Sequence, residues 1–309
     1  MKKSLAFITV ALCFSTVTLF AGPSGKSTVS ETTAAVEPAN LSFEFDAEQT
    51  GVGDGDVIRG NGPLALRDFY ESDTKIRFIL TPRTKIGILR LGAQWERYSF
   101  GFNGRSALPD VLEAENLVVG LDTEFSDSFL IRLELQPGFY GTDSTDWNSS
   151  TFNLPFILGG TYIFNPSFQV TFGVGVDAFR KYPVLPGGGI RWKFAPQWVL
   201  NAVAPTPRLE FEMTSNVTIY GGADIRATSY RVDEKFGTLR GDRRLNNGRM
   251  TFEEIRTGGG FEWKVATGLK LSLEGGVIPY RNFDFFGPHV RYHQDGAAPY
   301  GMIALRAAF

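Results

Sequence analysis

Bulky apolar and polar residues alternate along most of the chain beyond residue 41, and short clusters of turn-forming residues interrupt this alternation. Side chains on a β-strand point alternately to opposite faces, so the pattern predicts strands with one apolar and one polar face. Four stretches share a bulky apolar residue, three turn-forming residues and a second bulky apolar residue, which is typical of short hairpin connections. They are TEFSDSFLIRLEL (123–135), TYIFNPSFQVTFGV (161–174), RWKFAPQWVLNAV (191–203) and LEFEMTSNVTIYGG (209–222).

The hairpins also predict a strand register, if the bulky residues that flank each turn face each other. The polar face should then carry the cross-strand pairs Asp122–Arg132, Arg191–Asn201 and, in a similar hairpin around VATG (265–268), Glu262–Lys270. Opposite charges across a ladder stabilise it by about 0.2–1 kcal/mol. The predicted register therefore gains support, because it pairs complementary polar side chains on the polar face.

Longer polar stretches separate the hairpins, namely GTDSTDWNSST (141–151), RVDEKFGTLRGDRRLNNGR (231–249) and RNFDFFGPHVRYHQDGAAP (281–299). Short turns that alternate with long loops, on strands with one apolar face, are typical of a membrane barrel. The sequence therefore predicts an all-β fold, a single transmembrane antiparallel β-barrel of about 14 strands with 12 as the alternative, short periplasmic turns and long extracellular loops. The expected strands begin near residues 41, 74, 85, 115, 128, 153, 167, 188, 198, 207, 217, 250, 268 and 299.

The composition agrees with this fold and excludes two other classes of protein. The chain contains 31 basic and 33 acidic residues without a block of one sign, which argues against a nucleic-acid partner. Apolar residues make up 43%, but beyond the N-terminus no stretch of about 18 uncharged apolar residues occurs, so later helical membrane spans are not expected. With 35 Gly and 27 Phe, the apolar residues are distributed as an all-β protein requires.

The N-terminus has the layout of a bacterial secretory signal peptide. Lys2 and Lys3 precede an apolar run from Leu5 to about Phe20, and the small residues Ala21 and Gly22 follow. We therefore expect a signal peptide at 1–21, a flexible periplasmic lead-in at 22–40 and the barrel at 41–309. Cys13 is the only cysteine, so the expected mature chain has none and forms no disulfide.

The sequence YGMIALRAAF (300–309) predicts that the last strand seals the barrel. Lipid offers no hydrogen bonds, so the last strand must pair with the first. Alternation directs Ile303, Leu305, Ala307 and Phe309 towards lipid.

With the signal peptide and the hairpins, this ending resembles the bacterial outer-membrane β-barrel class. The resemblance implies a location in the cell outer membrane and an assembly signal, Ile303, Leu305 and Phe309, read by the β-barrel assembly machinery. The segment YPVLPGGGIRWKFAPQWVLNAVAPTPRLEFE (182–212) also resembles a bacterial barrel family without an assigned function.

The polar face is expected to line the lumen with mixed charge. The lumen-lining candidates are Arg132, Glu134, Arg191, Lys193, Arg208, Glu210, Glu212, Asp224, Arg226, Glu262, Lys270 and Glu274. Spread along the wall, such charges line a wet channel and set its selectivity, whereas interlocked in ion pairs they plug the barrel. The first hypothesis is a passive or weakly selective channel for small polar solutes. The alternative is a closed structural or surface-binding barrel whose loops contact lipopolysaccharide or a partner.

Catalysis, cofactors and metals are not expected. The two histidines, His289 and His293, lie near Asp284 and Asp295 in an expected solvated loop, and there is no G-x-S-x-G motif. GVGDGDVIRGNG (51–62) is expected to be an ordinary external loop, and PGGG (186–189) a turn at a loop end. The basic residues of 231–249 suggest contact with lipopolysaccharide phosphates or a preference for anions, with a plain solvated loop as the simpler interpretation.

Overall fold

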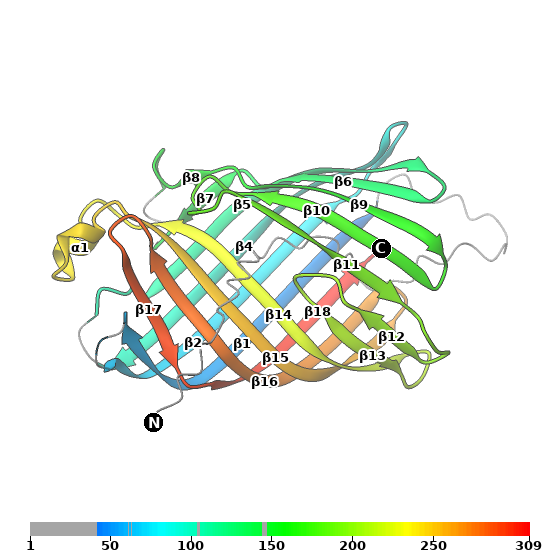
Figure 1. Cartoon of the computed structure of the whole chain (residues 1–309). Coiled ribbons are helices and arrows are strands. Elements are labelled where there is room, and N and C mark those ends of the chain that lie inside the picture. Colours follow the sequence, from blue (N-terminus) through cyan, green and yellow to red (C-terminus); the bar gives the residue numbers. More distant parts are fainter. Residues whose placement is uncertain (1–41, 61, 63, 104–105, 144–146) are drawn as a thin grey trace, which may run out of the picture.

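The computed structural model describes residues 42–60, 62, 64–103, 106–143 and 147–309, which form a closed antiparallel β-barrel (Figure 1). The first half contains β1 (Phe43–Arg59), β2 (Leu64–Leu80), β3 (Arg83–Thr84), β4 (Gly87–Asn103), β5 (Val111–Ser126), β6 (Phe129–Leu135), β7 (Gly138–Gly141), β8 (Phe152–Asn153) and β9 (Phe156–Asn165). The second half contains β10 (Phe168–Val176), β11 (Val184–Trp192), β12 (Trp198–Asn201), β13 (Arg208–Glu212), β14 (Val217–Arg231), α1 (Phe236–Leu239), the 3-10 helix η2 (Arg243–Leu245), β15 (Arg249–Ala266), β16 (Leu269–Phe285), β17 (Val290–Asp295) and β18 (Ala298–Ala308). The predicted signal peptide and lead-in lie outside the described residues.

The 18 strand segments of the described chain make 14 strands around the barrel. Four of the 14 strands are each interrupted and consist of two segments. β2 and β3 both pair with β4, and β6 and β7 both pair with β5. β8 continues into β9, and β17 and β18 both pair with β1. β1 pairs with β2 on one side and with β17 and β18 on the other, which closes the sheet. The predicted closed barrel with 14 strands is confirmed.

The hairpin register agrees with the sequence at two of three predicted pairs. Asp122 lies opposite Arg132, and Arg191 lies opposite Asn201. The third prediction was wrong, because Glu262 faces Ser272. A bulge beside the two-residue turn shifts the ladder between Lys264 and Ala266. The side chain of Lys270 nevertheless reaches back to Glu262, with Nζ 2.9 Å from Oε1.

Three expected loops or turns are strands instead. Residues 51–59 belong to β1, which continues through three register shifts between Val52 and Ile58 and pairs with a β2 that begins at 64 rather than near 74. Residues 281–285 belong to β16 and residues 290–295 form β17, with a turn at 286–289 between them. Polar residues are frequent in these segments, but an inward-facing row of apolar residues alternates with them. Phe283, Phe285 and Tyr292 belong to this row, and all three are buried.

The PGGG stretch (186–189) also lies within a strand, β11, rather than in a turn. Gly189 has a φ of 158°, and a Cβ built there would clash with the carbonyl oxygen of Ala202. Glycine is therefore required because β11 and the chain beyond β12 approach closely.

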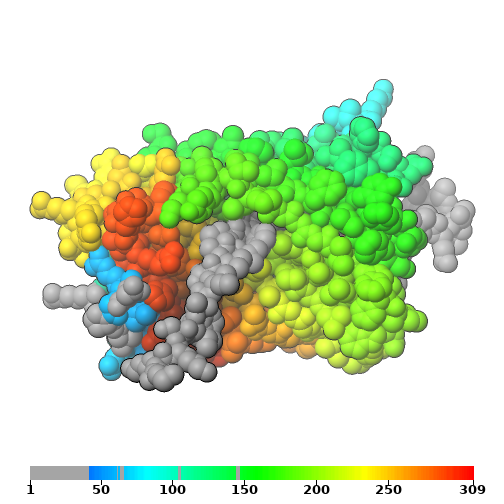
Figure 2. Space-filling view, in the orientation of Figure 1, coloured from blue at the N-terminus to red at the C-terminus, as the bar shows by residue number. Residues whose placement is uncertain are grey.

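The connection between β14 and β15 is partly buried rather than simply solvated. Val232, Phe236 and Leu245 from this connection are at most 3% exposed and pack into the interior of the barrel end. The space-filling view shows this yellow segment beside the orange-red β17 at one end of the molecule (Figure 2). We call this the long-loop end, and the opposite end, where Phe43 and Phe309 lie, the short-turn end.

The wall is uneven, because β12 and β13 have 4 and 5 residues whereas their neighbour β14 has 15. Beyond β13, the β14 edge is secured by the β10–β11 connection (177–183), where Arg180 donates a hydrogen bond to the Ala227 carbonyl at 2.5 Å. Arg249 donates to the carbonyl of Ala178 at 3.1 Å in the same connection. At this end β14 also contacts β5 and β7, so the barrel narrows towards its long loops.

The outer surface of the barrel is apolar across the middle of the strands. Large exposed side chains there include Phe78, Leu91, Leu117, Ile219, Phe261, Leu273 and Ile303. Aromatic residues gather at the short-turn end, where the ring centroids of Trp192 and Phe194 lie 5.6 Å apart. An apolar outer band with aromatic residues at its edge matches a lipid-facing surface.

Candidate functional site: the barrel interior

All twelve lumen-lining candidates are buried or half-buried in the structure. Each makes an ion pair or a hydrogen bond with another interior side chain. These pairs include Arg132–Asp122, Glu134–Arg77, Arg191–Glu210, Lys193–Glu212, Arg208–Glu210, Asp224–Arg226, Glu262–Lys270 and Glu274–Tyr300. The structure therefore brings these candidates together in networks rather than spreading them singly along the wall.

The densest network crosses the barrel between β14–β16 and β1–β2, and we call it the central belt. Its members are Glu48, Glu71, Asp73, Arg226, Glu254, Arg256 and Arg281. The side chains of Glu71, Asp73, Glu254 and Arg281 are 0% exposed and that of Arg256 is 1% exposed. Removal of charges from water is costly unless they are paired, so such burial requires the tight contacts seen here.

Arg226 and Arg256 hold the belt together from neighbouring strands. Arg226 places Nη1 2.6 Å from Asp73 Oδ2 and also pairs with Glu48. Arg256 places Nη2 3.0 Å from the same Asp73 oxygen, and its Nε pairs with Glu254. Because Asp73 lies on β2 while the arginines lie on β14 and β15, these contacts run across the lumen.

Arg281 completes the belt from β16. Its Nε lies 3.0 Å from Glu254 Oε2 and 3.2 Å from Glu71 Oε2, and its guanidinium carbon lies 5.4 Å from the centre of the Phe69 ring. Arg281 therefore joins the central belt to the apolar cluster that contains Phe69.

An apolar cluster fills the interior between the belt and the long loops. Its buried members include Phe69, Tyr98, Phe100, Phe252 and Phe283, whose rings contact one another with centroids 4.9–6.3 Å apart. Aromatic contacts of this kind stabilise packing beyond simple burial. The interior thus contains two different buried layers, one of ion pairs and one of rings.

A second set of ion pairs lies nearer the short-turn end. Arg90 donates two hydrogen bonds to the carboxylate of Glu44, at 2.9 and 2.8 Å. Arg132 likewise donates two to the carboxylate of Asp122, both at 2.6 Å. Arg77 lies 2.7 Å from Glu134. Several charges of this end remain partly exposed, including the side chains of Arg191 and Lys193 at 35% and 36%. This half of the lumen is therefore more accessible to water than the belt.

Sequence reasoning missed six members of the belt, namely Glu48, Glu71, Asp73, Glu254, Arg256 and Arg281. Glu71 and Asp73 lay before the expected start of the second strand, and Arg281 lay in an expected loop. Arg256 and Glu254 lie an even number of residues before Glu262, so alternation would have placed them on the inner face as well. Nothing in the sequence shows that these residues converge, because they come from distant strands.

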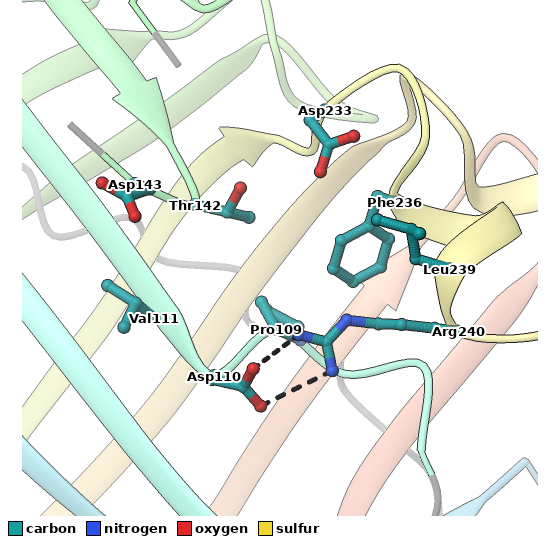
Figure 3. Close-up of a pocket in the computed structure, with 9 residues that line it drawn as sticks. All are labelled: Pro109, Asp110, Val111, Thr142, Asp143, Asp233, Phe236, Leu239 and Arg240. Carbon is teal, nitrogen blue, oxygen red and sulfur yellow. Dashed lines mark hydrogen bonds and ion pairs between the residues drawn. The ribbon is translucent and has the colours of Figure 1, made fainter. Parts of the chain in front are cut away.

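A pocket of about 500 Å³ opens at the long-loop end, which we call the mouth pocket (Figure 3). It is lined by Pro109, Asp110, Val111, Thr142, Asp143, Asp233, Phe236, Leu239 and Arg240. Three connections therefore contribute to it, those between β4 and β5, β7 and β8, and β14 and β15. Arg240 places Nη2 2.6 Å from Asp110 Oδ2.

The basic residues of the 231–249 connection are largely engaged with neighbours. Asp242 lies 2.6 Å from Arg59 and 2.7 Å from Arg244. The hydrogen bonds from Arg244 hold the pKa of the Asp242 carboxyl well below its usual range. Arg231 donates a hydrogen bond to Asn247 Oδ1 at 2.8 Å.

The two histidines do not form a recognisable site. His289 lies in the turn between β16 and β17 with a φ of 58°, whereas His293 lies within β17. Among the residues that the structure describes, no three His, Cys, Asp or Glu side chains gather as metal ligands would. No helix in the described chain is both long enough and apolar enough to span a bilayer.

The closed barrel, its apolar outer band and its charged interior define the class, an outer-membrane β-barrel protein. No family model and no curated protein sequence matches the chain.

Distant likenesses to solved outer-membrane channels exist. An outer membrane channel from Pseudomonas putida F1 is 8% identical with a TM-score of 0.45, over 90% of this chain and 100% of that one. The Pseudomonas putida toluene transporter TodX is 9% identical with a TM-score of 0.42, over 87% and 90%. The KdgM porin in complex with disordered oligogalacturonate is 10% identical with a TM-score of 0.34, over 87% and 99%. At such identities and TM-scores, these likenesses carry no argument about function.

Proposed function

We propose that the protein is a weakly selective channel for small polar solutes in the cell outer membrane, with a lumen that is closed in this conformation. The observation that carries the proposal is the central belt, which lies between the apolar cluster and the charged, partly exposed half of the lumen near the short-turn end. Among the residues that the structure describes, Arg226 and Arg256 form a charged layer of side chains across the lumen, and the apolar cluster lies beside it. Side-chain ion pairs can exchange partners while the wall stays intact, so the belt acts as a gate.

In the membrane, the short-turn end faces the periplasm and the long loops face outwards, as is usual for bacterial barrels. Residues 1–21 direct the chain across the inner membrane, and the barrel is inserted through recognition of Ile303, Leu305 and Phe309 by the assembly machinery. Outward exposure of these three side chains, at 48%, 37% and 59%, supports this part of the proposal. Membrane lipid and lipopolysaccharide then surround the apolar band.

Single-channel recordings in planar lipid bilayers test the proposal. The wild-type barrel should show brief or small conductance steps, and Arg256→Ala should lengthen or enlarge them because it unlocks Asp73, Glu71 and Glu254 together. Asp73→Asn serves as a milder variant, since it replaces the carboxylate shared by Arg226 and Arg256 with a neutral amide of similar shape. Arg97→Ala is the control, because Arg97 is 43% exposed and lies 3.9 Å from its nearest carboxylate.

A second candidate is a closed structural or surface-binding barrel, and the complete burial of Arg281 and Glu254 favours it. This candidate predicts silence from wild type, Arg256→Ala and Asp73→Asn alike. Heat-dependent gel mobility must show that each protein is folded. Silence from all three folded proteins would overturn the channel proposal and direct attention to the loops.

A further inference from the structure

The mouth pocket combines a volume suited to a small molecule with several kinds of chemical group. Its volume of about 500 Å³ lies within the range of about 300–1,000 Å³ that small-molecule sites occupy. Figure 3 shows Thr142 and Asp143 on one side, Asp233 and Phe236 on the other, and the Asp110–Arg240 pair below. Apolar and carboxylate groups therefore face a common space.

The charge of the lining favours a positively charged occupant. Asp110, Asp143 and Asp233 supply three carboxylates, and Arg240 is the only basic residue among the nine that line the pocket. The other arginines of this connection are directed elsewhere, as with Arg244, which pairs with Asp242. An anion would thus meet an excess of two negative charges, whereas a cation would reduce it.

Arg240 shows how this pocket already accommodates a cation. Its guanidinium donates to both oxygens of Asp110, at 2.6 and 3.5 Å, and its central carbon lies 5.0 Å from the centre of the Phe236 ring. A carboxylate beside an aromatic face is a general means of holding a guanidinium or ammonium group. The Asp110 side chain is 63% exposed, so this pair is weak and open to exchange with a competing cation.

Asp233 is held in place for a second positive group. Its Oδ1 accepts a hydrogen bond from the backbone N–H of Lys235 at 2.6 Å, and its carbonyl accepts one from Asn247 at 2.8 Å. A carboxylate fixed by the backbone loses little freedom when it binds a ligand. Asp233 and Asp110 therefore offer two anchoring points at one pocket.

We infer that the mouth pocket binds a small organic cation, in particular a compact dication with a short apolar linker, at the outer entrance of the barrel. The two ends of the ligand pair with Asp110 and Asp233, and the linker lies against Phe236 and Leu239. Phe236 also packs on Phe285 of the apolar cluster, with ring centroids 6.2 Å apart, so the ligand touches the layer that closes the lumen. Binding of the cation does not depend on the proposed channel function. A role of this binding in solute uptake does rest on that function.

Isothermal titration of the refolded full-length mature protein with agmatine tests the inference. Agmatine carries a guanidinium and an ammonium group on a four-carbon chain, and 1,4-butanediol is the neutral comparison. We expect saturable binding of agmatine and none of butanediol. Asp233→Asn should weaken agmatine binding by about tenfold or more through loss of a charged contact. Asp127→Asn, an exposed carboxylate at the opposite end of the barrel, should leave binding unchanged.

Arg240→Ala separates a binding role from a purely structural one. Removal of the resident guanidinium frees Asp110 and the Phe236 face, so agmatine should bind more tightly than to wild type. Equal heats for agmatine and butanediol, indifference to Asp233→Asn, or weaker binding by folded Arg240→Ala would each overturn the inference. Agmatine binding by a barrel without conductance would overturn only the channel proposal, and conductance without agmatine binding would overturn only the pocket.

Discussion

Phe43 and Phe309 exchange two backbone hydrogen bonds at the short-turn end of the barrel. The N–H of Phe43 donates to the carbonyl of Phe309 at 2.8 Å, and the N–H of Phe309 donates to the carbonyl of Phe43 at 3.0 Å. Their rings also meet, with centroids 5.3 Å apart. The first and last strands are thus joined at this end, which leaves no open edge between them in lipid.

Phe309→Ala should slow assembly while it changes the stability of the finished barrel little. The ring is 59% exposed, so its loss removes little packing, whereas the proposed assembly signal loses its aromatic residue. Insertion into liposomes that contain purified assembly machinery measures this effect. Phe164→Ala is the matched control, because Phe164 is also 59% exposed and lies in another strand at the same end. Equal insertion rates for the two variants would contradict the assembly role.

Arg256→Ala should destabilise the barrel by about 3–5 kcal/mol, the usual cost of one lost partner in a buried ion pair. Glu254 and Asp73 would stay buried with fewer partners. Urea unfolding in lipid vesicles, followed by tryptophan fluorescence, measures the loss. Arg97→Ala should cost no more than about 1 kcal/mol, because the Arg97 side chain is 43% exposed and its contact with Glu113 is long, at 3.9 Å. A loss for Arg256→Ala as small as that for Arg97→Ala would show that the belt contributes little to stability.

Arg180→Ala should loosen the connection at 177–183. Its side chain is 8% exposed and joins Asp177, at 3.1 Å, to the carbonyl of Ala227. Loss of these contacts should speed trypsin cleavage after the exposed Lys181 in the folded protein, by several-fold if opening costs about 1 kcal/mol less. Peptide mass mapping gives the rate. Arg243→Ala, on η2, is the control and should leave cleavage at Lys181 unchanged.

Acidification should leave the Asp242 contacts intact below the usual pKa of an aspartate. Hydrogen bonds from Arg244 and Arg59 lower the pKa of Asp242 from 3.8. A lowered pKa contributes stability that is present above 3.8 and is lost as the pH falls through the lower folded value. Asp242 should therefore remain ionised at pH 3.8, as its carboxyl ¹³C shift would report. A midpoint at or above 3.8 would contradict this prediction.

Much of the architecture followed from local pattern. Alternation assigned Arg132 and Leu133 to opposite faces, and the turn residues fixed the hairpin in which Asp122 meets Arg132. The same reasoning was wrong where local signals were weak or misleading. The glycines and aspartates of 51–59 read as a loop but are paired in β1, and the bulge beside Ala266 moved Glu262 away from its predicted partner.

The sequence by itself determined the barrel, its closure and the inward face of the strands with clear alternation, because these depend on period-two alternation and on turns a few residues long. Only the tertiary structure decided which charges from distant strands meet across the lumen. Arg226 is 153 residues from Asp73 along the chain, yet the two side chains lie 2.6 Å apart because the sheet closes into a barrel. The mouth pocket likewise exists only where three separate connections converge. Contacts across a lumen depend on curvature and strand length around the whole wall, which no local pattern encodes.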